Sequence, residues 1–169
     1  GFYLDDYVGC NVGQNLGYTY NGDNDDEGAT GYGINPPAQG LVYLNQSMSN
    51  FIYYNNDFTA NGNPSTANDY YNYLRGIWKD NVPITYGGDG HGSGVGSSTT
   101  PCNFMFPNVS DTSFSQQWSE ITAGNVPSDR RFLMSAGPVD LIATPIIQNI
   151  MAGINNIPPI IQLTNNEKI

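Results

Sequence analysis

The sequence predicts a mainly β fold, a sandwich or barrel-like module with long Gly- and Asn-rich loops. Short segments rich in aromatic and branched residues alternate with Gly, Pro, Asn and Ser, as strands alternate with turns. Asn21-Gly22 and Asn61-Gly62 are turn dipeptides that tolerate positive φ. The expected strands include residues 40–44, 51–54, 104–106 and 131–134.

A helix is predicted over residues 66–79 and inserted among these strands. Thr66 is suited to the N-cap and Asp69 to the first turn, where a negative charge is favourable. We expect an aromatic stripe on this helix to pack against a sheet, although the same rings would also suit a ligand platform. The stripe recurs at helical spacing and consists of Tyr70, Tyr71, Leu74, Ile77 and Trp78.

A second helix is predicted over about residues 145–156, because Thr144 is suited to its N-cap and Pro145 to its first position. Pro158-Pro159 would end it. Its aliphatic face would cover a sheet of the same domain, bind a neighbouring subunit, or pack on a region outside this sequence. We propose this face as an assembly element, made of Ile146, Ile147, Ile150, Met151, Ile154 and Ile157.

The chain divides into a β-rich module, residues 1–138, and an aliphatic tail, residues 139–169. Its 169 residues suit one domain with a core of its own. Gly1 stands where an initiator Met or a signal peptide would be, so we expect a mature or excised piece. No apolar run approaches the ~18 residues of a membrane span. The Gly- and Ser-rich stretch 86–100 is expected to be a long mobile loop.

The charge balance excludes nucleic acids and anionic membranes as partners. The formal net charge is −10, and no stretch concentrates Lys and Arg. Only 12% of residues are charged, and Asn, Gly, Ser, Thr and Tyr supply the remaining polarity. This composition is typical of an extracellular protein.

An acidic loop follows Tyr20 and predicts a Ca²⁺ site. Asp23, Asp25 and Glu27 alternate before a glycine, like the first half of a calcium loop. The second half is missing, because the twelfth position holds Ile34 in place of Glu, so Asn21 or carbonyl groups would complete the site. The alternative is a solvated acidic turn without a metal.

Cys10 and Cys102 are too few for a zinc cluster, so they form either one disulfide or two thiols. An extracellular setting favours the disulfide, which would close a long loop and stabilise the fold by a few kcal/mol.

The sequence offers little for catalysis, and we expect no enzyme. Asp89 and Ser93 flank His91, the one histidine, but neighbours in a flexible loop do not make a catalytic triad. No phosphate-binding loop is present, and a single histidine excludes the common zinc enzymes. In the stretch 128–131 we expect a structural salt bridge where a strand begins.

Several motifs resemble a segment of large secreted surface proteins of Bacteroidota, which are exported by type IX secretion and end in a sorting domain. The resemblance implies an extracellular or cell-surface location and no established enzyme activity. It covers about residues 3–138, whereas the tail departs from the pattern and is either a self-association element or the boundary of the piece. The motifs are DDYVGC (5–10), YTYNGDNDDEGATGYGINPPAQG (18–40), FIYYNND (51–57), NDYYNYLRGIWKDN (68–81), ITYGG (84–88), NFMFP (103–107) and WSEITAGNVPSDRRFLMSAGP (118–138).

We therefore expect a noncatalytic cell-surface module for structure or adhesion, able to assemble with its own copies or another surface protein in a layer or filament. The alternative is a carbohydrate-binding or carbohydrate-processing domain, because Tyr and Trp side chains stack well on sugars.

Overall fold

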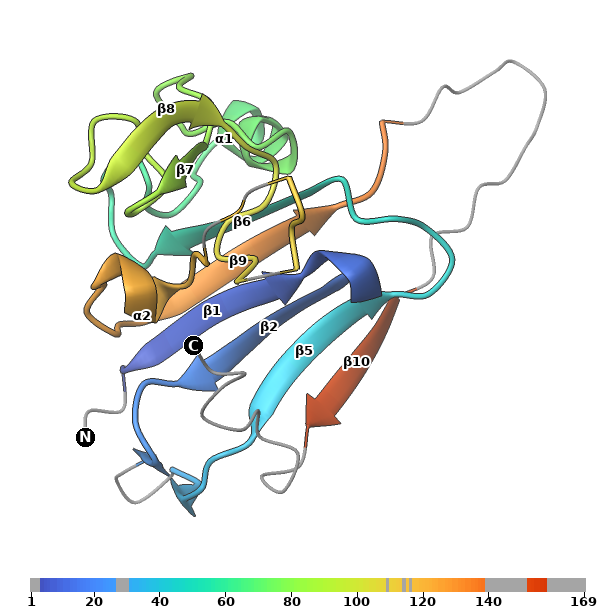
Figure 1. The fold of residues 1–169 in the computed structure, drawn as a ribbon, viewed down its shortest axis with the longest axis vertical. Coiled ribbons are helices and arrows are strands. Elements are labelled where there is room, and N and C mark those ends of the chain that lie inside the picture. Colours follow the sequence, from blue (N-terminus) through green and yellow to red (C-terminus); the bar gives the residue numbers. More distant parts are fainter. Residues whose placement is uncertain are drawn as a thin grey trace.

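The computed structural model describes residues 4–26, 31–108, 110–113, 115, 117–138 and 152–157. Within these ranges the predicted mainly β class is confirmed: ten strands accompany two short α-helices and one 3-10 turn (Figure 1). The strands form one four-stranded sheet and three two-stranded sheets, so the described part contains no closed barrel. No helix in it is long and apolar enough to cross a membrane.

The four-stranded sheet is antiparallel, in the order β1-β2-β5-β10. A tight connection at Val12–Gln14 (η1) joins its first two strands, and the Asn11 side chain caps this turn by accepting from the Gln14 amide. The strands span Asp6–Asn11 (β1), Leu16–Asn21 (β2), Ala38–Tyr43 (β5) and Ala152–Ile157 (β10).

A strand pair packs against this sheet: β6 (Asn50–Asn55) with β9 (Arg130–Ser135). β9 lies alongside β1 (Figure 1), and the Ser128 amide donates to the Asp6 carbonyl at 3.1 Å. At Gly17 of β2 the approach is close, because a Cβ there would lie 2.7 Å from the Phe51 ring. A side chain at Gly17 would separate the two layers.

Two further hairpins complete the β structure. β3 (Asp25–Asp26) pairs with β4 (Gly33–Ile34) beyond the end of β2. β7 (Thr85–Gly87) pairs with β8 (Ser97–Pro101), so the stretch 86–100 is more ordered than we predicted. Two buried indole N–H groups hold its backbone: Trp78 donates to the Gly90 carbonyl and Trp118 to the Gly88 carbonyl.

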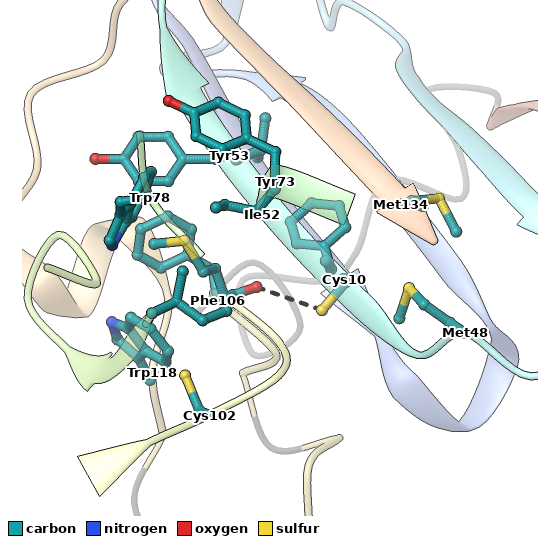
Figure 2. Packing of buried hydrophobic residues seen from close by; sticks show 14 residues of the cluster. Cys10, Met48, Ile52, Tyr53, Tyr73, Trp78, Cys102, Phe106, Trp118 and Met134 are labelled. Carbon is teal, nitrogen blue, oxygen red and sulfur yellow. Dashed lines mark hydrogen bonds between the residues drawn. The ribbon is translucent and has the colours of Figure 1, made fainter. Parts of the chain in front are cut away.

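The core is largely aromatic and sulfur-rich (Figure 2). Some of its ring pairs meet edge to face, a geometry that aromatic quadrupoles favour, and others are tilted; the Tyr53 and Trp78 rings are nearly perpendicular, with centroids 6.0 Å apart. The largest apolar side chains buried within it belong to Trp78, Tyr73, Phe51, Phe106, Ile52, Ile84 and Met105.

Helix α1 (Ala67–Leu74) begins as predicted but ends five residues early. Thr66 and Asp69 form a capping box, and the chain turns at Gly76, whose φ of +69° breaks the helix. The predicted stripe is wrong for Tyr70, Tyr71 and Leu74, which are exposed, while Tyr73 is fully buried. The buried residues of the helix are therefore Asn72 and Tyr73, not the predicted stripe.

Helix α2 (Glu120–Ala123) was not predicted from the sequence, because a single turn is too short to show helical periodicity. Ser119 caps it by accepting from the Thr122 amide, and Gly124 ends it with a φ of +72°.

The predicted C-terminal helix is wrong for residues 152–156, because residues 152–157 form β10 along the edge of β5. Ile154 pairs with Leu41 and Ile157 with Ala38. The helix is disfavoured by three weak helix formers, Gly153, Asn155 and Asn156. The strand is favoured because its pairing satisfies the backbone hydrogen-bonding groups of β5. The other proposed assembly residues, Ile146, Ile147, Ile150 and Met151, lie outside the described residues.

The predicted disulfide is also absent, since Cys10 and Cys102 are free buried thiols. The Cys10 Sγ donates to the Met105 carbonyl at 3.3 Å instead (Figure 2). Each cysteine acts as a small apolar core residue. Burial raises the pKa of the Cys102 thiol to about 12 and that of the Cys10 thiol well above its ordinary value.

Candidate functional site

A pocket of about 490 Å³ lies where β1 begins and β2 ends. We call it the acidic pocket, because three carboxylates line it: Asp5, Asp6 and Asp26. Apolar surface comes from Tyr20, Tyr32, Pro36 and Pro37, and further polar groups from Thr19, Asn21, Gln39 and Arg130.

Strand register brings these residues together. Asp6 starts β1 directly opposite Asn21, the last residue of β2. The β3–β4 hairpin lies beyond this end of the sheet, and the Asp26 carboxylate stabilises it by accepting from the Tyr32 amide at 2.9 Å. Tyr32 is 77% exposed, so most of its side-chain surface is available to a ligand.

The carboxylates of the pocket repel one another. The pKa of Asp6 is raised to about 6, first by burial and then by the charges of Asp5, Asp129 and Asp26, which outweigh the lowering by Arg130. The pKa of Asp5 is raised by burial and by Asp23, although the Asn21 amide donates to its carboxylate at 2.9 Å. The pocket is therefore most negative above about pH 6.

Arg130 is largely committed to a different partner, the buried carboxylate of Glu120. Its Nε donates to Glu120 Oε2 at 2.9 Å, and a second guanidinium nitrogen donates to the Val126 carbonyl at 2.6 Å. The other Glu120 oxygen accepts from the Val8 amide at 2.8 Å. Burial raises the pKa of Glu120, while Arg130 and the Val8 amide lower it. This pair ties α2 and β9 to β1.

The salt bridge expected in the stretch 128–131 is present, since Arg131 contacts Asp129 at 3.3 Å. The more deeply buried pair is Arg130 with Glu120, which lies ten residues away and carried no sequence signal.

Among the predicted calcium ligands, Asn21 and Asp23 each accept a hydrogen bond from a backbone amide two residues further along the chain. The side-chain Oδ1 of Asn21 accepts from the Asp23 amide at 3.0 Å, and the Asp23 carboxylate accepts from the Asp25 amide at 2.8 Å. Glu27 lies outside the described residues. In the part that the structure describes, no three Asp, Glu, His or Cys side chains are grouped to hold a metal. Calcium at this loop stays a prediction.

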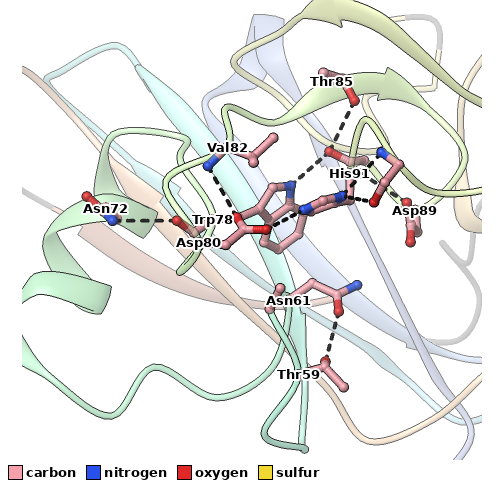
Figure 3. A network of polar contacts seen from close by, with 12 residues as sticks. Thr59, Asn61, Asn72, Trp78, Asp80, Val82, Thr85, Asp89 and His91 are labelled. Carbon is pink, nitrogen blue, oxygen red and sulfur yellow. Dashed lines mark hydrogen bonds and ion pairs between the residues drawn. The ribbon is translucent and has the colours of Figure 1, made fainter.

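His91 forms a polar clip, but with a different acid from the expected neighbour (Figure 3). Its Nε2 contacts Asp80 Oδ2 at 2.8 Å and its Nδ1 contacts Ser93 Oγ at 2.6 Å. An ionised carboxylate only accepts, so in the neutral ring Nε2 carries the proton and Nδ1 accepts from Ser93. Asp89 instead accepts from the His91 amide at 3.0 Å. The clip links the turn after α1 to the β7–β8 connection.

Sequence reasoning missed Asp5, Asp6, Tyr20 and Tyr32 as site residues. Two adjacent aspartates before a strand, and a second acidic group just after the next strand, were the available signal. An antiparallel hairpin brings such positions together.

No protein family matches this chain, and neither the curated proteins nor the solved structures contain a significant match.

Proposed function

We propose that this chain is a noncatalytic adhesion module of an extracellular, cell-surface protein, and that the acidic pocket is its ligand-binding site. The pocket itself carries the proposal, because carboxylates with raised pKa values beside exposed aromatic surface are typical of functional sites. The location rests on the composition and on the resemblance to proteins exported by type IX secretion.

The ligand class that best fits the acidic pocket is a carbohydrate. Carboxylates accept hydrogen bonds from sugar hydroxyl groups, and the rings of Tyr20 and Tyr32 offer faces for the apolar side of a sugar. The net charge of −10 disfavours anionic ligands.

Glycan-array screening followed by calorimetric titration tests this proposal. Tyr32→Ala removes an exposed ring and should weaken binding about tenfold, equivalent to about 1.4 kcal/mol. Asp26→Asn should also weaken it, because the amide replaces an acceptor oxygen with a donor. Tyr70→Ala on α1, outside the acidic pocket, is the matched control and should bind like the wild type. Equal affinity of Tyr32→Ala and wild type would reject the pocket as the binding site.

Calcium remains part of the proposal as a stabiliser of the acidic loop, through Asp23, Asp25, Glu27 and Asn21. Alternating carboxylates repel one another without a cation. Saturating Ca²⁺ should raise the Tm relative to chelator, and Asp25→Ala should remove this gain. An identical Tm in calcium and in chelator would exclude the site.

Self-assembly is a second candidate function, favoured by the position of β10. This edge strand reaches β5 after the intervening stretch 139–151, and β5 of the same copy or of a neighbour offers it the same hydrogen bonds. Gln39 and Asn156 face each other in this register, so cysteines placed there can cross-link.

Two single variants, Gln39→Cys and Asn156→Cys, are mixed and oxidised to test self-assembly. Strand exchange between copies predicts a cross-linked heterodimer. A double variant that carries both cysteines tests pairing within one chain. If only this double variant cross-links, β10 pairs with β5 of its own chain and the proposed self-assembly through the tail is rejected. Gln39→Cys mixed with Gly153→Cys is the out-of-register control.

A further inference from the structure

The acidic pocket carries unbalanced negative charge. Three carboxylates line it, whereas Arg130 is the one Lys or Arg among the described residues of its lining. The guanidinium group of Arg130 is engaged elsewhere: Nε donates to Glu120, and the two terminal nitrogens donate to the Asn55 side chain and the Val126 carbonyl. The Arg130 side chain is also only 7% exposed. Arg130 therefore balances the buried Glu120 rather than the carboxylates of the pocket.

Asp6 is the carboxylate of the pocket that is left without a partner. Asp5 accepts from the Asn21 side-chain amide at 2.9 Å, and Asp26 accepts from the Tyr32 backbone amide at 2.9 Å. In the part of the chain that the structure describes, no donor forms a hydrogen bond with the Asp6 carboxylate. Burial and the neighbouring aspartates raise its pKa, even though Arg130 lowers it. A cationic donor beside Asp6 would supply both the missing hydrogen bond and the missing charge.

The size of the pocket favours an organic cation over a metal ion. Among the described residues, no three acidic, His or Cys side chains are grouped closely enough to hold a metal. The volume of about 490 Å³ lies within the roughly 300–1,000 Å³ that is usual for small-molecule sites. An ammonium group attached to a sugar ring would place its charge among the carboxylates while the ring occupies the remaining space.

The aromatic surface of the pocket suits the same ligand. Tyr32 is 77% exposed, and Tyr20, Pro36 and Pro37 extend the apolar lining beside it. The face of a tyrosine ring packs against the apolar side of a sugar and also attracts a nearby cation. A neutral sugar would use these rings but not the charge of the pocket, and an anionic sugar would be repelled by it.

We infer that the acidic pocket selects a sugar that carries a primary amine, such as a glucosamine unit whose nitrogen is not acetylated. The inference rests on the carbohydrate-binding function proposed above and names the class of sugar. The ammonium group of the ligand donates to Asp6, and Tyr32 supplies the face for the ring. Acetylation of the nitrogen removes the positive charge and with it the selective contact.

Calorimetric titration of the full chain with two matched oligosaccharides tests this inference. The probes are the β-1,4-linked tetrasaccharide of glucosamine and its fully N-acetylated counterpart. At pH 7, where Asp6 is largely ionised, and in 150 mM NaCl, we expect the amine form to bind about tenfold more tightly. Asp6→Asn keeps an acceptor oxygen but removes the charge, so it should weaken the amine form about tenfold and the N-acetylated form about twofold or less.

Asp25→Asn is the matched control, because it removes the same net charge from an exposed residue outside the pocket lining. It should leave the preference for the amine unchanged, and the Tm of each variant reports whether the chain is folded. A preference that persists in folded Asp6→Asn, or that Asp25→Asn removes to the same extent, would overturn the inference.

The same titrations separate this inference from the proposed function. Equal affinity for the two oligosaccharides, weakened in both cases by Tyr32→Ala, would overturn the selection of an amine while leaving the pocket as a carbohydrate site. Failure of both oligosaccharides to bind would also overturn the inference, and the glycan array alone would then decide the proposed function.

Discussion

Asp6 lowers the stability of the folded chain at neutral pH, and Asp6→Asn should restore it. The folded state binds the Asp6 proton more tightly than the unfolded chain, because its pKa is about 6 against an ordinary 3.8. Stability contributed by the protonated form is therefore complete below about pH 3.8 and is lost as the pH rises towards 6.

The size of the effect follows from the same shift. A change from 3.8 to about 6 corresponds to at most about 3 kcal/mol at 1.36 kcal/mol per unit. Asp6 is only partly buried, so solvent screening reduces the expected cost to about 1 kcal/mol. For a chain of this length that equals about 2–4 °C in Tm.

Urea unfolding at pH 7.5 and at pH 4 measures this difference. We expect Asp6→Asn to stabilise the chain by about 1 kcal/mol at pH 7.5 and by much less at pH 4, where Asp6 is largely protonated in the folded state. Asp25→Asn is the matched control, because Asp25 is exposed, and its effect should be small at both pH values. An equal gain at both pH values, or a loss at pH 7.5, would refute the electrostatic argument.

Three further changes probe the rest of the fold. Glu120→Ala should destabilise the chain by about 3–5 kcal/mol in urea unfolding, because it leaves Arg130 without its buried partner; a cost below 1 kcal/mol would contradict this. His91→Ala should lower the free energy of unfolding by about 1 kcal/mol, because it removes the hydrogen bonds to Asp80 and Ser93; unchanged stability would show that these bonds do not stabilise the fold. Thiol titration of the denatured, unreduced chain should find two reactive cysteines; finding none would show that Cys10 and Cys102 form a disulfide after all.

Local sequence signals predicted what depends on a few neighbouring residues. The start of α1 is one such feature, because Thr66 and Asp69 cap each other across three positions. The strand segments near residues 51–54 and 131–134 were recognised for a similar reason: their composition and flanking turns are local properties. The mainly β class followed from the same signals.

The tertiary structure decided which of these segments meet. Gly76 ends α1, and packing of the helix against β6 and β9 buries Tyr73 while Tyr71 stays exposed. β10 is a strand because β5 offers it an unpaired edge, a partner more than a hundred residues away. The acidic pocket and the Arg130–Glu120 pair likewise join residues from separate strands and turns. Sequence alone fixes contacts within about one helical turn, while burial, charge repulsion and strand pairing depend on partners that only the folded chain brings together.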